Sequence, residues 1–322
     1  MKTFFSLIVI LSFLPGISAA QDTLVFYWDK NGRQVEEVGS ADIIQKITPV
    51  PGSTELYQVR EYNHQGLLQL EGTVSEYKPR LHFEDLVRRF DKKGGLASEI
   101  NYKDNKYEGE AKFYYKNGQL REVVEHYHAP NPMNPHGSSE VHVKMVAYFD
   151  SLGNQQVKDG NGFAIVKTDA FTEKGRYSDG VKDSIWTGVS SKSDFSYIEK
   201  FDKGKFVSGE SVSDGQKFVY NQQEIQPEYP GGIMQFYQYI GRNYKYPAEA
   251  RKKGVSGTVI VSFVVEKDGS LTDLKTLRDL GMGTGEEALR VVKNSPSWIP
   301  GKQHGVPVRV QYTLPIRLNL SR

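Results

Sequence analysis

The sequence predicts an all-β N-terminal region of repeated hairpins, followed by an α+β C-terminal domain in which helices cover one face of a three-stranded antiparallel sheet. Two observations carry this prediction. From Leu56 to about Tyr220, aromatic and polar segments alternate with turns that contain glycine. After a break rich in proline and glycine at about Gln226, the order changes to helix, strand, strand, helix, strand. We therefore divide the 322 residues into 1–20, 21–225 and 226–322.

The first segment, residues 1–20, has the layout of a secretory signal peptide. One basic residue precedes an apolar run from Phe4 to Leu14, and small residues lead to Ala20. The run is about eleven residues long, whereas a helix that spans a bilayer needs about 20. We expect cleavage after Ala20 and export to the periplasm. An uncleaved membrane anchor is the alternative interpretation.

Composition excludes several classes of function. The chain has no cysteine, which rules out disulfides, thiol catalysis and cysteine-ligated zinc. Lys and Arg number 41 against 39 Asp and Glu, and no basic run concentrates the net charge of +2. Nucleic acid is therefore not an expected partner.

The repeated hairpins are marked by Asn-Gly, Asp-Gly and Lys-Gly turns, which supply the positive φ that tight hairpins need. Two copies show the pattern well, "YKNGQLRE" from Tyr115 to Glu122 and "YSDGVKDSIWTG" from Tyr177 to Gly188. In series these copies resemble the MORN-like variant repeats of exported bacterial proteins. The resemblance implies a β-meander scaffold without catalytic activity of its own.

One stretch, from Glu125 to Val143, interrupts the repeats and carries four of the seven histidines. His126 and His128 would share one face of a strand, because side chains alternate with period two. They are the candidates for a metal-ligand pair. No fixed spacing joins His136 or His142 to this pair, so we expect no metal site and no cofactor.

The C-terminal elements follow from periodicity and turn chemistry. Apolar residues recur at helical spacing before Asn243 and again after Thr284, which with Glu287 matches a capping box. Asp268-Gly269 marks a hairpin, whose return strand alternates poorly and suggests a bulge. The expected helices cover about residues 233–243, 248–253 and 284–294, and the expected strands cover 258–265, 271–277 and 306–314.

The last expected strand should lie at an edge of its sheet. Apolar and polar residues alternate strictly from Val306 to Leu314, and Pro307 and Pro315 lack the backbone donor that a central strand would need. An edge strand leaves backbone groups available to another extended chain. The same edge could pair with a second copy of this protein and give a homodimer.

The C-terminal segment resembles the C-terminal domain of TonB-family energy transducers, over about Gln226 to Leu320. The motifs occur in the family's order: Pro-Glu-Tyr-Pro-Gly-Gly from Pro227, Tyr246-Pro247, Gly254 and Gly257, Asp268-Gly269, Trp298 with Pro300-Gly301, and Gly305-Val306-Pro307-Val308. The resemblance implies a periplasmic domain that adds the TonB box of an outer-membrane transporter to its sheet as an extra strand. Carried onto this sequence, the implied contacts are Tyr246, Pro247, Arg309, Val310, Gln311, Tyr312 and Thr313.

The N-terminal part departs from that family, whose members carry a transmembrane helix and a proline-rich spacer there. We therefore favour a periplasmic binding or adaptor module that engages a TonB-dependent transporter or another envelope protein. A membrane-anchored energy transducer with an uncleaved first segment is the second interpretation. The third is an exported enzyme or metal-binding protein that uses the His126–His142 loop. We expect no enzyme, because no catalytic motif occurs in a recognisable context.

Overall fold

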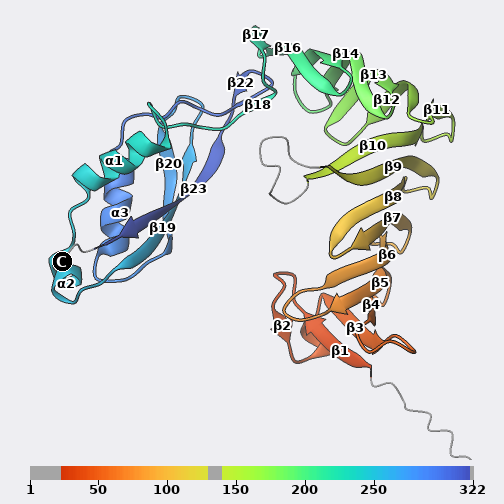
Figure 1. Cartoon of the computed structure of the whole chain (residues 1–322), viewed down its shortest axis with the longest axis horizontal. Coiled ribbons are helices and arrows are strands. Elements are labelled where there is room, and N and C mark those ends of the chain that lie inside the picture. Colours follow the sequence, from red (N-terminus) through yellow and green to blue (C-terminus); the bar gives the residue numbers. More distant parts are fainter. Residues whose placement is uncertain (1–22, 130–139, 320–322) are drawn as a thin grey trace, which may run out of the picture. The chain divides into compact units, whose positions relative to one another are not determined.

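A computed structural model describes residues 23–129 and 140–319 (Figure 1). The expected cleavage after Ala20 and the histidine at His136 lie outside the described residues. The chain forms two compact units. The first runs to Lys144 and includes Ser151–Asn154, and the second comprises Met145–Asp150 and everything from Gln155 on.

The first unit is an antiparallel meander, in which each strand from β3 to β9 pairs with the next and β1 pairs with β2 and β3. Its strands are β1 (Leu24–Trp28), β2 (Gln34–Val35), β3 (Ile43–Pro49), β4 (Tyr57–Asn63), β5 (Leu68–Glu76), β6 (His82–Phe90), β7 (Leu96–Lys103), β8 (Lys106–Tyr114) and β9 (Leu120–Ala129), with a short 3₁₀ turn at Val38–Ser40.

A ladder of alternating charges crosses this meander. Arg60, Glu71, Arg88, Glu99 and Lys112 lie directly opposite one another on five successive strands. Arg88 contacts both acidic neighbours, at 3.3 Å from Glu71 and 2.9 Å from Glu99. Opposite charges in directly paired positions favour this register over its slipped alternatives. The ladder thus helps to fix the register of these five strands.

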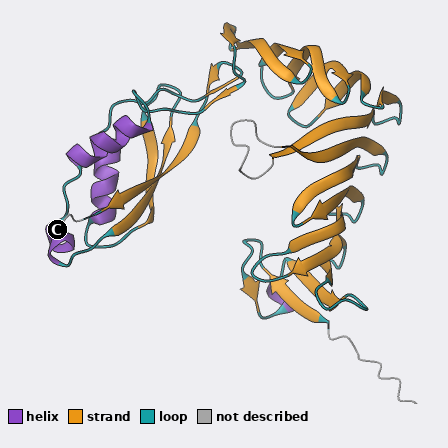
Figure 2. Cartoon of the chain, in the orientation of Figure 1, coloured by secondary structure: helices purple, strands orange, loops and turns teal. Residues whose placement is uncertain are grey.

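The second unit begins with another antiparallel meander, seen as successive strands in Figure 2. Asp179-Gly180 and Asp214-Gly215 join its neighbouring strands as two-residue turns with positive φ at both positions, as the Asp-Gly signals predicted. The strands are β10 (Glu140–Phe149), which starts in the first unit, β11 (Gln155–Lys158), β12 (Asn161–Lys167), β13 (Phe171–Ser178), β14 (Val181–Ser190), β15 (Ser196–Asp202), β16 (Lys205–Ser213) and β17 (Gln216–Tyr220).

Glycine and aromatic residues alternate across this second meander. Gly188 lies opposite Tyr197, and Gly209 lies opposite Tyr220. Each ring lies flat over the neighbouring glycine, because a Cβ placed at either glycine would come within 2.2 Å of ring atoms. The aromatic residues of the repeats therefore pack on backbone of the next strand as well as on one another.

The remaining chain forms the α+β part and confirms the predicted fold class. Its main sheet has the order β20-β19-β23 and is antiparallel throughout. Helices α1 and α3 lie beside this sheet (Figure 1). The core of this part contains Phe236, Phe263 and Trp298. The elements are β18 (Glu224–Ile225), α1 (Ile233–Asn243), α2 (Ala248–Lys252), β19 (Gly257–Val265), β20 (Leu271–Arg278), α3 (Thr284–Lys293), β21 (Lys302–Gln303), β22 (Val306–Pro307) and β23 (Val310–Leu318).

Two sequence expectations for this region are wrong in detail. The single strand predicted from Val306 is split, since β22 pairs with β21 in a small separate sheet and the N–H of Val308 turns to the carbonyl of Gly301. The capping box at Thr284 does not form. Its hydroxyl bonds to Asp279 instead, and Glu287 accepts the N–H of Lys245. In both places the backbone or side chains take other hydrogen-bond partners than the pattern predicted, and of these partners only Lys245 is distant in sequence.

Candidate functional site

The last strand, β23, is an edge strand. It pairs with β19 from Val310, opposite Val265, to Leu318, opposite Gly257, and with no other strand among the described residues. This confirms the edge position that was predicted for the last strand, in which Pro315 lies, whereas Pro307 belongs to β22. The register of β23 with β19 contains no shift, so its outer side offers a regular row of backbone groups.

Pro315 determines which backbone groups face outward. It lies opposite Ile260 in an unbroken register and has no N–H to donate, so it must occupy a pair that exchanges no hydrogen bonds. Because pairs alternate along an antiparallel ladder, Gln311 and Thr313 also turn their N–H and C=O groups away from β19. Pro315 interrupts the outward row, and the usable edge therefore ends at Thr313.

The side chains of the predicted contact segment divide between the two faces of the sheet. Val310 and Tyr312 are half-buried, and the Tyr312 ring lies 5.2 Å from that of Trp298. On the exposed face Arg309 binds Glu266 through two nitrogens, at 2.7 and 2.8 Å. That contact is the main reason why the pKa of Glu266 lies below its ordinary value. Arg309 thus holds β23 against β19 and leaves the outer backbone uncovered.

The opposite edge of the sheet is less suited to strand addition. The pairing of β20 with β19 shifts register twice, which confirms the predicted bulge. Asp273, within β20, has a φ of 50°. Such irregularities twist an edge and interrupt its row of backbone groups. Between the two edges, β23 is the better template for an added strand.

Tyr246 and Pro247 lie toward the other end of β23 from Arg309–Thr313. The Tyr246 hydroxyl donates to the carbonyl of Val255, two residues before β19 begins. The first residue of β19, Gly257, pairs with Leu318 at the C-terminal end of β23. The structure therefore does not bring the two parts of the predicted contact set together.

His126 and His128 both lie on β9. His126 is buried, its Nδ1 has no hydrogen-bond partner, and burial lowers its pKa. The Nε2 atom of His128 lies 2.9 Å from a carboxylate oxygen of Glu108. Within the described part of the chain, no group of three or more His, Cys, Asp or Glu side chains could hold a metal ion. Of the two histidines, His128 is thus tied to β8 through Glu108.

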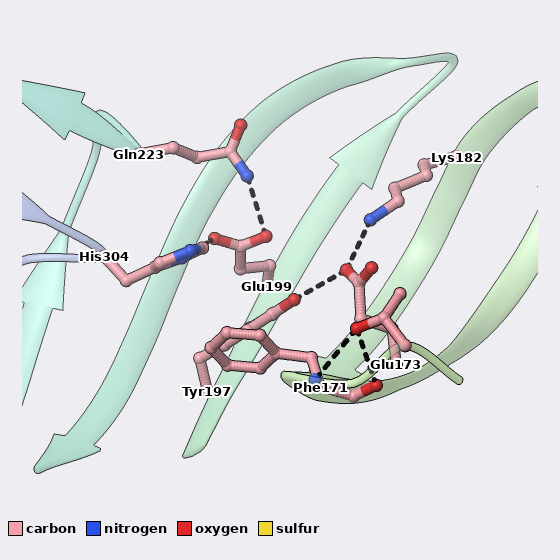
Figure 3. Close-up of a pocket in the computed structure, with 8 residues that line it drawn as sticks. Phe171, Glu173, Lys182, Tyr197, Glu199, Gln223 and His304 are labelled. Carbon is pink, nitrogen blue, oxygen red and sulfur yellow. Dashed lines mark hydrogen bonds and ion pairs between the residues drawn. The ribbon is translucent and has the colours of Figure 1, made fainter. Parts of the chain in front are cut away.

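A second site, which the sequence did not predict, surrounds a cavity of about 260 Å³ on the second meander (Figure 3). Its centre is Glu199, whose side chain is only 1% exposed. The carboxylate accepts hydrogen bonds from Tyr220 at 2.9 Å, Gln223 at 2.8 Å and the Nδ1 of His304 at 2.8 Å. His304 lies in the C-terminal part of the chain, so this cluster joins it to the repeats.

A second carboxylate, Glu173, lies on the same wall of the cavity (Figure 3). It accepts hydrogen bonds from Lys182 at 2.8 Å and from the hydroxyl of Tyr197 at 2.6 Å. Sequence patterns did not single out His304, which directly precedes the Gly305-Val306-Pro307-Val308 motif. Its partner Glu199 is 105 residues away, so no local pattern could pair them.

The two carboxylates are stabilised in their ionised forms. Burial raises the pKa of Glu199, but the hydrogen bonds from His304, Gln223 and Tyr220 outweigh it and hold the pKa below 4.5. Burial also raises the pKa of Glu173. The neighbouring Lys182 and Tyr197 outweigh that effect and lower the pKa below its ordinary value. Burial and the adjacent carboxylates raise the pKa of Tyr197 and Tyr220. The cluster is therefore a fixed network at neutral pH.

These shifts predict an acid-sensitive contact. Because the folded-state pKa of Glu199 and Glu173 lies below the ordinary 4.5, their ionised forms stabilise the fold above that pH, and the contribution is lost as the pH falls through the folded-state values. We expect the urea midpoint of the protein to fall as the pH is lowered from 5 to 3. The fall should be shallower in Glu199→Gln. Parallel pH profiles for the two proteins would contradict the assignment.

Comparison with known proteins identifies the C-terminal part of the chain. Residues 242–320 match the family model of the Gram-negative bacterial TonB protein C-terminal. Six solved chains are similar, among them the solution structure of the Helicobacter pylori TonB C-terminal domain. That match has 28% identity, covers 28% of this chain and 81% of that chain, and has a TM-score of 0.23. A search of curated proteins gave no match.

The chain thus carries a TonB C-terminal domain at residues 242–320, behind a long antiparallel β-meander region. This domain family is non-catalytic, belongs to the cell envelope, and implies energy transduction to TonB-dependent outer-membrane transporters. No helix of the described residues has the length and apolar character needed to cross a membrane.

Proposed function

We propose that this protein is a periplasmic binding module that captures an extended segment of a TonB-dependent outer-membrane transporter, its TonB box, by adding the segment to β23 as a further strand. The observation that carries the proposal is the regular outer edge of β23, where Gln311 and Thr313 direct their backbone groups away from β19. Another envelope protein with an exposed extended segment would be captured in the same way.

The captured segment would pair along Arg309–Thr313 and stop at Pro315. Arg309 and Gln311 side chains already bind Glu266 and Ser262 across the sheet, so recognition at this point is mainly through backbone. Tyr246 and Pro247 would contact the partner only where its segment continued past Pro315 toward the C-terminal end of β23. Affinity would thus come from the first part of the edge, and the second part would add selectivity.

The meander region would serve as a MORN-like scaffold that holds a second partner or fixes the module in the envelope. In that arrangement the protein is an adaptor, exported after cleavage at Ala20. The intact mass of the native protein tests this part of the proposal. A mass that includes residues 1–20, found in the membrane fraction, would favour the anchored energy transducer instead.

Proline substitutions test capture by the edge. In Thr313→Pro the outward N–H is lost while the ladder with β19 keeps its hydrogen bonds, as it does at the natural Pro315. Arg317→Pro is the matched control, because Arg317 has the same outward orientation but lies beyond Pro315. In pull-downs from envelope extract, we expect wild type and Arg317→Pro to retrieve TonB-dependent transporters and Thr313→Pro to lose them.

The retrieved transporter supplies the second half of this test. Deleting its TonB box should abolish binding to the wild-type protein. Equal retrieval by Thr313→Pro and wild type, or undiminished binding after the deletion, would show that β23 is not the capturing element. Sedimentation at increasing concentration separates the remaining possibility, since self-pairing through β23 would give a dimer that Thr313→Pro dissociates.

A further inference from the structure

The hairpin of β21 and β22 places its turn, His304-Gly305, against the last repeat strands. Three hydrogen bonds fix it there. The N–H of His304 donates to the carbonyl of Gln223 at 2.7 Å, its carbonyl accepts from the hydroxyl of Ser211 at 2.7 Å, and its Nδ1 donates to Glu199 at 2.8 Å. The imidazole also stacks on Tyr197, with ring centroids 4.5 Å apart and planes 12° apart.

The backbone of the turn is shaped for this contact. His304 and Gly305 have φ values of 49° and 78°, as a two-residue hairpin turn requires. A Cβ at Gly305 would lie 3.0 Å from the ring of Tyr220. Glycine at this position therefore permits both the conformation of the turn and its close approach to the meander.

The connection between the meander and the C-terminal domain is itself paired. Glu224 in β18 lies opposite Gln303 in β21, and Glu228 exchanges two backbone hydrogen bonds with Ile299. The two segments between the meander and the C-terminal domain, at residues 224–228 and 299–303, are thus hydrogen-bonded to each other, unlike a free linker. Strands β11–β17 and the C-terminal domain belong to one compact unit.

The same short segment that carries this contact leads into the edge strand. Only Gly305–Val308 separate His304 from Arg309, and the N–H of Val308 is fixed on the carbonyl of Gly301. We propose that His304 is a positioning residue: its seating between Glu199 and Tyr197 fixes the start of β23 on the repeat meander, so that strand capture at β23 and seating of the hairpin stabilise each other. The capture half of this statement rests on the proposed function.

Removal of His304 would leave a buried carboxylate with one donor fewer. Glu199 would then be held by Tyr220 and Gln223 alone. Losing a hydrogen bond to a buried charge destabilises the fold. Water would have to reach the Glu199 carboxylate in place of the imidazole, which requires the hairpin to move. We therefore expect the hairpin to leave its seat in His304→Ala and to return in His304→Gln, whose amide can still donate to Glu199.

Spin labels test the seating directly, because a chain without cysteine accepts two engineered cysteines cleanly. Exposed Lys192, between β14 and β15, and Leu277 on β20, which is 59% exposed, place one label on each part. We expect a narrow distance distribution in the labelled parent, a broad one in His304→Ala, and a narrow one in His304→Gln. The control His64→Ala, at an exposed turn of the first unit, should not differ from the parent.

Capture is measured on the same variants with the transporter retrieved by the wild type. We expect His304→Ala to bind about tenfold more weakly, which corresponds to about 1.4 kcal/mol, and His304→Gln to restore binding, since its amide can still donate to Glu199. A narrow distribution in His304→Ala overturns the proposal. So does a broad distribution with unchanged affinity. If the parent itself captures no transporter, the proposed function fails while the label distances still decide the seating.

Discussion

Gly188→Ala should lower the free energy of unfolding by about 3 kcal/mol, because a methyl group at this position would occupy the space of the Tyr197 ring. Its Cβ would lie 2.2 Å from ring carbons. The ring cannot move without breaking its 2.6 Å hydrogen bond to Glu173 and its stacking on His304. The backbone of Gly188 has an ordinary φ, so the substitution tests close approach rather than conformation.

Urea unfolding followed by tyrosine and tryptophan fluorescence measures the change. Gly241→Ala is the matched control: Gly241 lies within α1, and a Cβ there meets no atom within 4 Å. Alanine should raise stability at this position by about 0.5–1 kcal/mol through its helix propensity. A small effect of Gly188→Ala, close to that of the control, would mean that the ring does not depend on the glycine beneath it.

This pairing shows what sequence patterns could and could not predict in the meander. Turns such as Asp179-Gly180 are local, and so their positions and conformations followed from residue type alone. The partnership of Gly188 with Tyr197 depends on the register of two strands, which the repeats indicated only as a tendency to alternate. The same limit applies to the charge ladder that includes Arg88 and Glu99, whose members are visible in sequence only after pairing is known.

The C-terminal domain was more predictable because the order of its helices and strands is distinctive. Prolines at 307 and 315 indicated an edge strand, and β23 occupies that edge. The split before Val310 and the missing capping box at Thr284 arose where the N–H of Val308 and the hydroxyl of Thr284 bonded to Gly301 and Asp279, in the loops that precede them. Such hydrogen bonds within irregular loops leave no periodic signal. Binding through Arg309–Thr313 stays a prediction, as does contact by Tyr246 and Pro247.

The buried network around Glu199 illustrates the same limit at the candidate site. Glutamate in an alternating strand ordinarily faces solvent, and its neighbours Ile198 and Lys200 give no indication of a buried carboxylate. Its burial becomes intelligible once Tyr220, Gln223 and His304 supply three donors. Tyr220 lies two strands further on, in β17, and Gln223 follows it in the connector, but His304 comes from a turn in the C-terminal part of the chain.

The second large effect is expected at Trp298, which is 3% exposed at the centre of the C-terminal core. Its ring lies 4.9 Å from Phe236 and 5.3 Å from Phe263, and its backbone N–H donates to Gly269 in the β19–β20 turn. Trp298→Ala should cost about 4 kcal/mol, since it removes a large ring from a packed site that can collapse only partly. The C-terminal domain would unfold first in urea.

Trp298→Phe provides the control that separates packing from hydrogen bonding. The indole Nε1 is buried without a partner, so the smaller ring loses volume but also removes an unsatisfied donor. Its cost should therefore be less than half that of alanine. Because Tyr312 in β23 also contacts the indole, at 5.2 Å, the alanine variant should weaken transporter capture as well. Equal losses of stability in the two variants would show that a phenyl ring recovers none of the packing of the indole, which contradicts this prediction.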